Sequence, residues 1–139
     1  MDVHLSHLVH DQRLCELLSH YYECQADDVR LIEELCTTDQ FDDCTVLAQR
    51  LSRAGDFPLS ISILSAPQGC IESDSYLAIQ LCKLAQCFAL VADSSPDPYK
   101  WVILDGLGNQ TEVLVDGDAM DDQDAFIIPD ERRPTWFFR

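Results

Sequence analysis

Apolar residues return every three or four positions through the first 55 residues, with polar residues between them. This spacing is typical of amphipathic helices, so we predict three short helices in this part of the chain. The aspartates at 27, 28 and 39 suit helix N-termini, and Gly55 suits the position after a helix end. The three apolar stripes are Leu5, Leu8, Cys15, Leu18 and Tyr22; Val29, Ile32, Leu35 and Cys36; and Phe41, Cys44, Leu47, Ala48 and Leu51.

The period changes from about 3.6 to 2 after Phe57. Leu59, Ile61 and Ile63 alternate with less apolar neighbours, which predicts a half-buried strand. A turn at 66–69 ends it. A helix is predicted from about Ser73, and its few polar positions favour a central place in the core.

The apolar run at 87–92 can extend that helix or form a strand of its own. We favour the strand, because Phe88–Asp93 and Tyr99–Leu104 then form a hairpin. Turn residues at 105–109 lead to a further predicted strand over Thr111–Asp116. A short last strand is predicted over Ala125–Ile128, which Pro129 ends.

The sum of these elements predicts an α+β fold. Three N-terminal helices are followed by a strand and a helix, and then by an antiparallel β-meander. At 139 residues and 47% hydrophobic content, the chain is expected to form a single domain, 1–139. The helical part, 1–56, and the sheet-containing part, 57–139, are expected to share one core.

The cysteines and the N-terminus predict a cytoplasmic protein. The seven cysteines are odd in number and form no CxxC pair, which favours reduced thiols. Residues 1–10 contain Asp2 and three histidines in place of a basic and then apolar signal peptide. The longest apolar-rich stretch, 76–92, is interrupted by Gln80, Lys83 and Gln86, so no membrane span is expected.

The sequence gives only weak evidence for a catalytic or metal-binding site. His4, His7 and His10 step by about 300° on a helix and cannot face one zinc ion together, although His20 and Cys24 stand one turn apart. Cys70 precedes a predicted helix, but the acids that follow it oppose a reactive thiolate. The acids from Asp116 onward fail the EF-hand spacing. We expect no enzyme activity, no metal site and no cofactor.

The charge is the strongest functional signal. Twenty-five acids against nine bases give a formal net charge of −16. The stretch from Asp105 to Glu131 contains no Lys or Arg. A solvated loop and a binding surface are equally good interpretations of this stretch. Direct nucleic-acid binding is not expected, because it depends on basic residues at phosphates. The candidate partner-binding residues are Asp105, Glu112, Asp116, Asp118, Asp121, Asp122 and Asp124.

These features predict a non-enzymatic acidic protein that binds a basic partner protein. By analogy of charge and size alone, it would neutralise a nuclease toxin as an immunity protein does, or block a nucleic-acid-binding machine as a nucleic-acid mimic does. The alternative is a small acidic cytosolic chaperone or adaptor for a secreted or assembled protein, which would bind through apolar grooves or sheet edges. Homo-oligomer formation is left open. The aromatic tail at 136–138 is expected to dock on the fold in preference to a partner.

Overall fold

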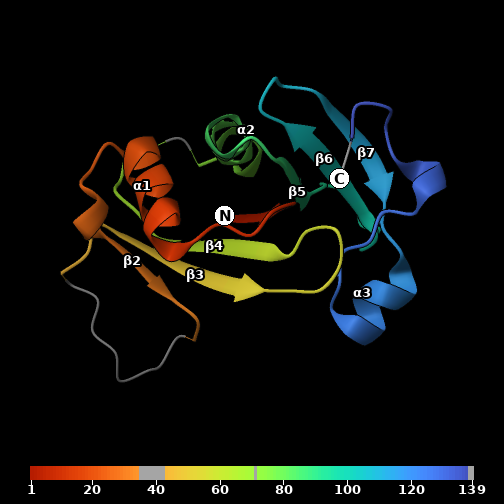
Figure 1. Ribbon diagram of the computed structural model, residues 1–139, viewed down its shortest axis with the longest axis horizontal. Helices are drawn as coiled ribbons and strands as arrows, with labels where there is room; N and C mark the ends of the chain where they lie inside the picture. The colour runs from red at the N-terminus through yellow and green to blue at the C-terminus, as the bar shows by residue number, and fades with distance from the viewer. Residues whose placement is uncertain (35–42, 71, 138–139) are drawn as a thin grey trace.

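The computed structural model describes residues 1–34, 43–70 and 72–137. Strands and helices are interspersed along the chain (Figure 1). Two single-turn 3₁₀ helices, Ala26–Asp28 and Asp130–Arg132, complete the described elements. In chain order the others are β1 (Asp2–Leu5), α1 (Asp11–Tyr22), β2 (Val29–Ile32), β3 (Val46–Ser52), β4 (Leu59–Ser65), α2 (Asp74–Ala85), β5 (Phe88–Ala92), β6 (Lys100–Asp105), β7 (Gln110–Leu114) and α3 (Gly117–Gln123).

The strands form one mixed sheet of seven, in the order β2-β3-β4-β1-β5-β6-β7. β2 and β3 are parallel, and every other neighbouring pair is antiparallel. The N-terminal strand β1 lies in the middle, between β4 and β5. It therefore joins the β2–β4 half of the sheet to the β5–β7 meander.

The structure is α+β, but the predicted arrangement with three N-terminal helices is wrong. Only α1 is an α-helix in the described part of residues 1–56, and the chain begins with a strand. The second predicted helix is replaced by β2 and the third by β3. The predicted positions Leu35, Cys36, Asp39 and Phe41 lie outside the described residues.

The physical reason is strand pairing over long sequence distances. Short apolar segments fit either period, and the available partners decide between them. Val3 pairs with Ile61 of β4, and Val46 and Ala48 of β3 face the same buried layer, with Leu47 between them. In these strands, residues two apart in sequence share one face of the sheet, in place of the predicted helical stripe.

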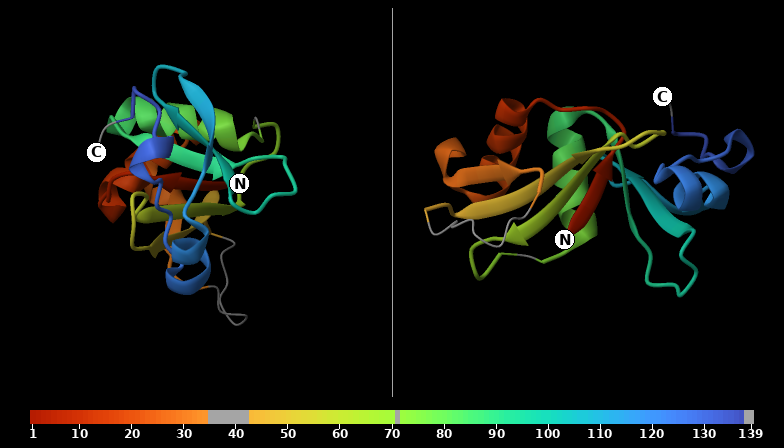
Figure 2. Two further views of the ribbon diagram at one scale, coloured as in Figure 1. Left: turned by 90° about the vertical axis from the view of Figure 1, so that its right-hand side faces the viewer. Right: turned by 90° about the horizontal axis from the view of Figure 1, so that it is seen from below.

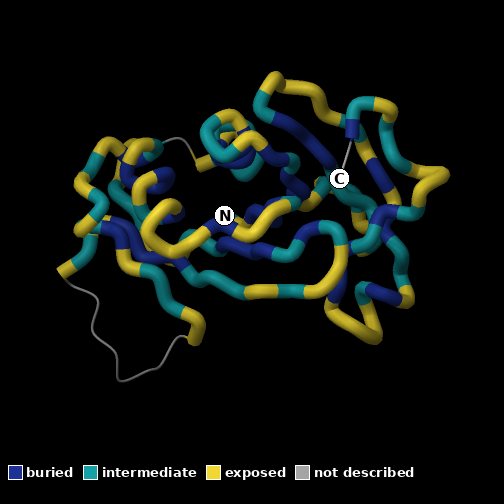
Figure 3. The backbone as a smooth tube through the Cα atoms, viewed as in Figure 1, coloured by how far each residue is buried: buried dark blue, intermediate teal, exposed yellow. Residues whose placement is uncertain are grey.

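One face of the sheet is covered by α1 and α2. Their buried leucines, including Leu14, Leu18, Leu77 and Leu81, pack on Val3 and its neighbours in the central strands. Figure 3 shows these central strands as the most continuously buried part of the chain. This layer is the larger of the two hydrophobic cores.

The opposite face carries a second core over β5–β7, beneath the C-terminal segment. Phe57 is fully buried there, and its ring stacks on Phe137 at 5.9 Å between centroids. Trp136 and Phe137 both contact Phe88, so these two residues of the predicted tail dock on the fold, whereas Phe138 lies outside the described residues. Figure 2 shows that α3 and the C-terminal segment lie at one end of the molecule, away from α1.

The observed elements after residue 57 agree better with the predicted ones. β4, α2, β5 and β6 occupy the predicted segments, and 88–92 is a strand. Ser73 caps α2 by accepting from the Tyr76 amide. The predicted strand at Ala125–Ile128 is absent from the described elements, where Phe126 makes only an isolated bridge to Gly55. Helix α3 was not predicted.

Candidate functional site

The structure divides the predicted partner-binding acids into two groups. Asp105 and Glu112 lie on the β6–β7 hairpin, at its turn and in its last strand. The other group is gathered on α3 and its two end residues, and consists of Asp116, Asp118, Asp121, Asp122 and Asp124. We call this second group the α3 carboxylates.

The two hairpin acids have internal partners. The Asp105 carboxylate accepts hydrogen bonds from the amides of Leu107 and Asn109 and from the Asn109 side chain, at 2.9–3.0 Å. Glu112 lies 3.0 Å from Lys100 Nζ on β6 and raises the pKa of that ammonium group. Asp105 therefore shapes the turn, and Glu112 forms a cross-strand ion pair.

Helix α3 forms because both of its ends are satisfied locally. The Asp116 side chain accepts from the Ala119 amide at 3.1 Å, which is the bond expected of an N-cap residue. Asp124 adopts the left-handed conformation that ends many helices. Gly117 passes close to Tyr99, whose ring would lie 3.2 Å from an added Cβ. Ala119 is buried and holds the helix against the fold.

Two of the α3 carboxylates fasten the helix to the sheet. The Tyr99 hydroxyl donates to Asp121, and this bond raises the pKa of Tyr99. Asp124 forms an ion pair with Arg53, which precedes β4 in the chain. The Arg53 guanidinium also lies over the Phe126 ring, 5.7 Å from its centroid.

Arg53 connects α3 to a buried histidine in the centre of the sheet. Its Nε donates to the Ser60 hydroxyl at 2.7 Å, and Ser60 Oγ lies 2.6 Å from His4 Nδ1. Burial, reinforced by the nearby Arg53 charge, lowers the pKa of His4 to about 4. His4 packs against Trp101 and Phe126, so it is a neutral core residue.

Asp118 and Asp122 are the α3 carboxylates that are exposed and form no ion pair or side-chain hydrogen bond with another described residue. They stand four residues apart, so they occupy the same face of the helix. Both are exposed, and no Lys or Arg within the described ranges forms an ion pair with either. Two like charges at this spacing destabilise a helix by a few tenths of a kcal/mol. The Asp116 cap and the contacts of Asp121 and Asp124 stabilise the helix against this repulsion.

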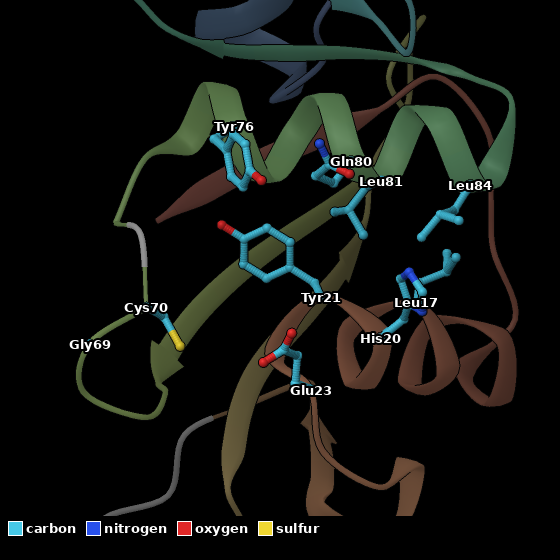
Figure 4. A pocket seen from close by; sticks show the side chains of 10 residues that line it. All are labelled: Leu17, His20, Tyr21, Glu23, Gly69, Cys70, Tyr76, Gln80, Leu81 and Leu84. Carbon is cyan, nitrogen blue, oxygen red and sulfur yellow. The ribbon is translucent and has the colours of Figure 1, made fainter.

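A cavity of about 320 Å³ lies between α1 and α2, far from the α3 carboxylates. Leu17, Leu81 and Leu84 provide its apolar lining. The rings of Tyr21 and Tyr76 lie beside each other at 5.9 Å between centroids (Figure 4). The cavity is an aromatic and aliphatic groove with a few polar groups.

The groove does not assemble a thiol nucleophile with a base. Cys70 and His20 both line it, but they lie on opposite sides of Tyr21 in Figure 4. His4, the first residue of the predicted histidine set, is instead buried in β1. Within the described part of the chain, no three His, Cys, Asp or Glu residues are placed to share a metal ion.

Two features of the sites were missed by sequence reasoning. The ion pair of Arg53 with Asp124 joins residues 71 positions apart, and no local pattern indicates it. The hydroxyl of Tyr22 is buried and has no hydrogen-bond partner among the residues that the structure describes. The sequence signal for Tyr22 was only its place on an apolar helical stripe, which predicts burial of the ring and nothing about its hydroxyl.

Comparison with known proteins assigns no relative. No protein-family model, no curated protein and no solved structure matches this chain. Among the helices of the described residues, none has both the length and the apolar character needed to cross a bilayer. The fold and the site therefore define an acidic α+β protein with a carboxylate-bearing helix at one end of its sheet.

Proposed function

We propose that the chain is a non-enzymatic protein that binds a basic surface of another protein through the α3 carboxylates. The observation that carries this proposal is the pair Asp118 and Asp122, exposed on one helical face without a cation among the described residues. A basic partner would relieve their repulsion and pair with both. The net charge of −16 adds long-range attraction for the same partner.

The attachment of α3 supports this role. The Asp116 cap stabilises the start of the helix, and the Tyr99–Asp121 hydrogen bond and the Asp124–Arg53 ion pair attach the helix to the rest of the fold. Side chains presented from a fixed element lose less conformational freedom on binding than those of a mobile loop. The partner is expected to carry a surface of the kind that binds phosphate, as nucleases and nucleic-acid-binding machines do. Inhibition of such a partner is the activity we propose.

The place of action is proposed to be the cytoplasm. Cys15, Cys24, Cys70, Cys82 and Cys87 form no disulfides. Cys82 and Cys87 are both buried with their sulfurs 4.0 Å apart, and they remain thiols. Reduced cysteines at this density suit a compartment that keeps thiols reduced.

The test replaces Asp118 and Asp122 together with Asn, which keeps their shape and removes two charges. The matched control is Asp27→Asn with Glu33→Gln, which removes two exposed charges near β2. A basic protein captured from the native host at low salt serves as the partner. Its association rate is then measured against ionic strength for each variant.

We expect D118N/D122N to slow association by roughly two- to tenfold at low salt and to flatten its salt dependence. The control should change both quantities much less. Equal rates and equal salt slopes in the two variants would remove α3 from the interface. Binding that is unaffected by salt would instead support the chaperone or adaptor alternative, which depends on apolar contacts.

A further inference from the structure

Strand β7 is the outermost strand at one end of the sheet, so it pairs with β6 on one side only. In an antiparallel pair, residues that bond to the neighbouring strand alternate with residues that face away from it. The odd-numbered residues of β7 bond to β6, as the backbone bonds at Asn109 and Val115 show. The amides and carbonyls of the even-numbered residues, Gln110, Glu112 and Leu114, therefore point away from the sheet.

The chain itself uses the end of this outer side that is nearest to α3. The Leu114 carbonyl accepts a hydrogen bond from Arg132 Nη1 at 3.3 Å. The Asp116 amide donates to the Ile127 carbonyl at 2.8 Å. These bonds agree with the outward direction of the even-numbered residues. They also show that this side of β7 accepts a second segment of chain.

The amides and carbonyls of Gln110 and Glu112 are the part that the chain does not use. Within the described ranges, no hydrogen bond is made to these four groups, which we call the β7 edge. Both residues are exposed, and a hollow of about 610 Å³, which they line with Val102 and Thr111, adjoins them. β7 has no Pro, Lys, Arg or bulge, which are common protections of an edge strand. The β7 edge is therefore open to pairing.

The chemistry of the β7 edge specifies the kind of partner. Alternating backbone donors and acceptors are matched by another extended chain. Glu112 is exposed, and its cation Lys100 also lies 4.0 Å from Asp93, so carboxylates outnumber cations here. A second copy of the chain would bring another acidic edge and another net charge of −16. A basic strand avoids this repulsion.

We propose that the β7 edge pairs with an extended basic segment of the partner protein. Its backbone bonds to Gln110 and Glu112, and an Arg or Lys side chain lies beside the Glu112 carboxylate. β7 leads directly into α3 (Figure 1), so one partner can contact both the edge and the α3 carboxylates. This proposal rests on the proposed function for the basic nature of the partner, and it adds backbone pairing to the charge contacts.

The probe is a backbone-cyclised β-hairpin peptide whose open strand reads Thr-Val-Arg-Val-Thr, with the backbone groups of its arginine pointing outwards. The closed ring holds the strand extended, so little conformational freedom is lost on binding. Two matched hairpins serve as controls. One has Glu in place of Arg, and the other carries an N-methyl group on the arginine amide, which removes a donor and keeps the charge.

Hydrogen exchange of single amides, followed by NMR on the whole chain, measures the binding. We expect the arginine hairpin at saturation to slow exchange of the Gln110 and Glu112 amides by about tenfold or more. The amides of Thr111 and Val113 already bond to β6 and should not change. The N-methylated hairpin and the Glu hairpin should each bind more weakly, by about tenfold or more.

Substitutions at Gln110 test the same bond from the protein side. Gln110→Pro removes one outward N–H and leaves the bonds to β6, because Pro is tolerated where an edge N–H faces solvent. Gln110→Ala removes the same side chain and keeps the N–H. We expect similar urea midpoints for the two variants, and about tenfold weaker hairpin binding for Gln110→Pro alone. If Gln110→Pro does not fold, the N-methylated hairpin decides.

Three results would overturn the proposal. Unchanged exchange at Gln110 and Glu112 would remove the strand contact, and equal binding of the N-methylated hairpin would reduce it to charge alone. Equal binding of the Glu hairpin would exclude a basic strand as the preferred occupant. Slowed exchange at the same amides in concentrated protein at high salt would assign the β7 edge to a second copy instead. The titration needs no partner, so its failure and the failure of the α3 test are distinguishable.

Discussion

His4 makes the stability of this protein depend on pH in a defined window. The residue is 7% exposed, and its ring packs against Trp101 and Phe126 and faces Ser60 and Arg53. Burial is the largest cause of its lowered pKa, and the Arg53 charge acts in the same direction. The carboxylates of Asp2 and Asp124 oppose the shift only in part. The folded protein therefore resists protonation of His4.

The size of the effect follows from the two pKa values of His4. The imidazole titrates near 6.5 when unfolded and near 4 when folded. Between these values the unfolded state binds the extra proton, so the free energy of unfolding falls as the pH falls. The loss begins below 6.5 and is complete below about 4, where it amounts to about 3 kcal/mol. Between about pH 7 and pH 5 the expected loss is about 2 kcal/mol.

The assay is urea unfolding followed by tryptophan fluorescence at the two pH values. His4→Gln is the comparison, because glutamine keeps hydrogen-bonding capacity and does not titrate. The carboxylates titrate alike in both proteins, so the difference between the two pH-dependent losses isolates His4. We expect the parent protein to lose about 2 kcal/mol more than the variant. Equal losses would refute the assignment of His4 as a buried neutral residue.

Four further substitutions test the packing and the turns. Gly55→Ala should cost at least about 2 kcal/mol, because its φ is positive and a Cβ would lie 2.6 Å from the Phe126 oxygen. Gly69→Ala, with positive φ and open space, should cost about 1 kcal/mol, and equal costs in urea melts would contradict the contact. Phe57→Ala should cost about 3–5 kcal/mol by the same measurement, and a loss below about 1 would place Phe57 outside the core. Asp105→Ala should cost about 2 kcal/mol through its lost turn hydrogen bonds, and unchanged stability would argue against that role.

Elements with a strong local signal were predicted well. The alternation of Leu59, Ile61 and Ile63 gave β4, and the Ser73 cap with its apolar stripe gave α2. The 88–92 run was ambiguous by period, and the hairpin argument chose correctly because a strand partner followed within a few residues. A local pattern predicts an element correctly where the strand that pairs with it is also close in sequence.

The N-terminal half failed for the opposite reason. β1 pairs with β4 and β5, from which it is separated by more than fifty residues. Spacing of Leu5 and Leu8 fits a helix, yet Leu8 is exposed and Leu5 is fully buried in a strand. Helix α3 was missed for a similar reason. Its acid-rich sequence is typical of a loop, and the helix depends on contacts with Tyr99 and Arg53 as well as on the Asp116 cap.

The sequence by itself determined the acidity, the base-free segment from 105 to 131 and the strand–helix order from residue 57 to residue 114. These depend on composition and on patterns shorter than one element. Only the tertiary structure decided that Asp105 supports a turn and that Asp118 and Asp122 stand exposed together. It also decided that His4 is buried and neutral, and that the Tyr22 hydroxyl has no hydrogen-bond partner in the described part of the chain. The charge state of His4 depends on groups far apart in sequence meeting in low-dielectric surroundings, where burial and pairing set the charge state and the hydrogen bonds. The exposure of Asp118 and Asp122 depends on helix α3, which contacts with Tyr99 and Arg53 hold against the fold.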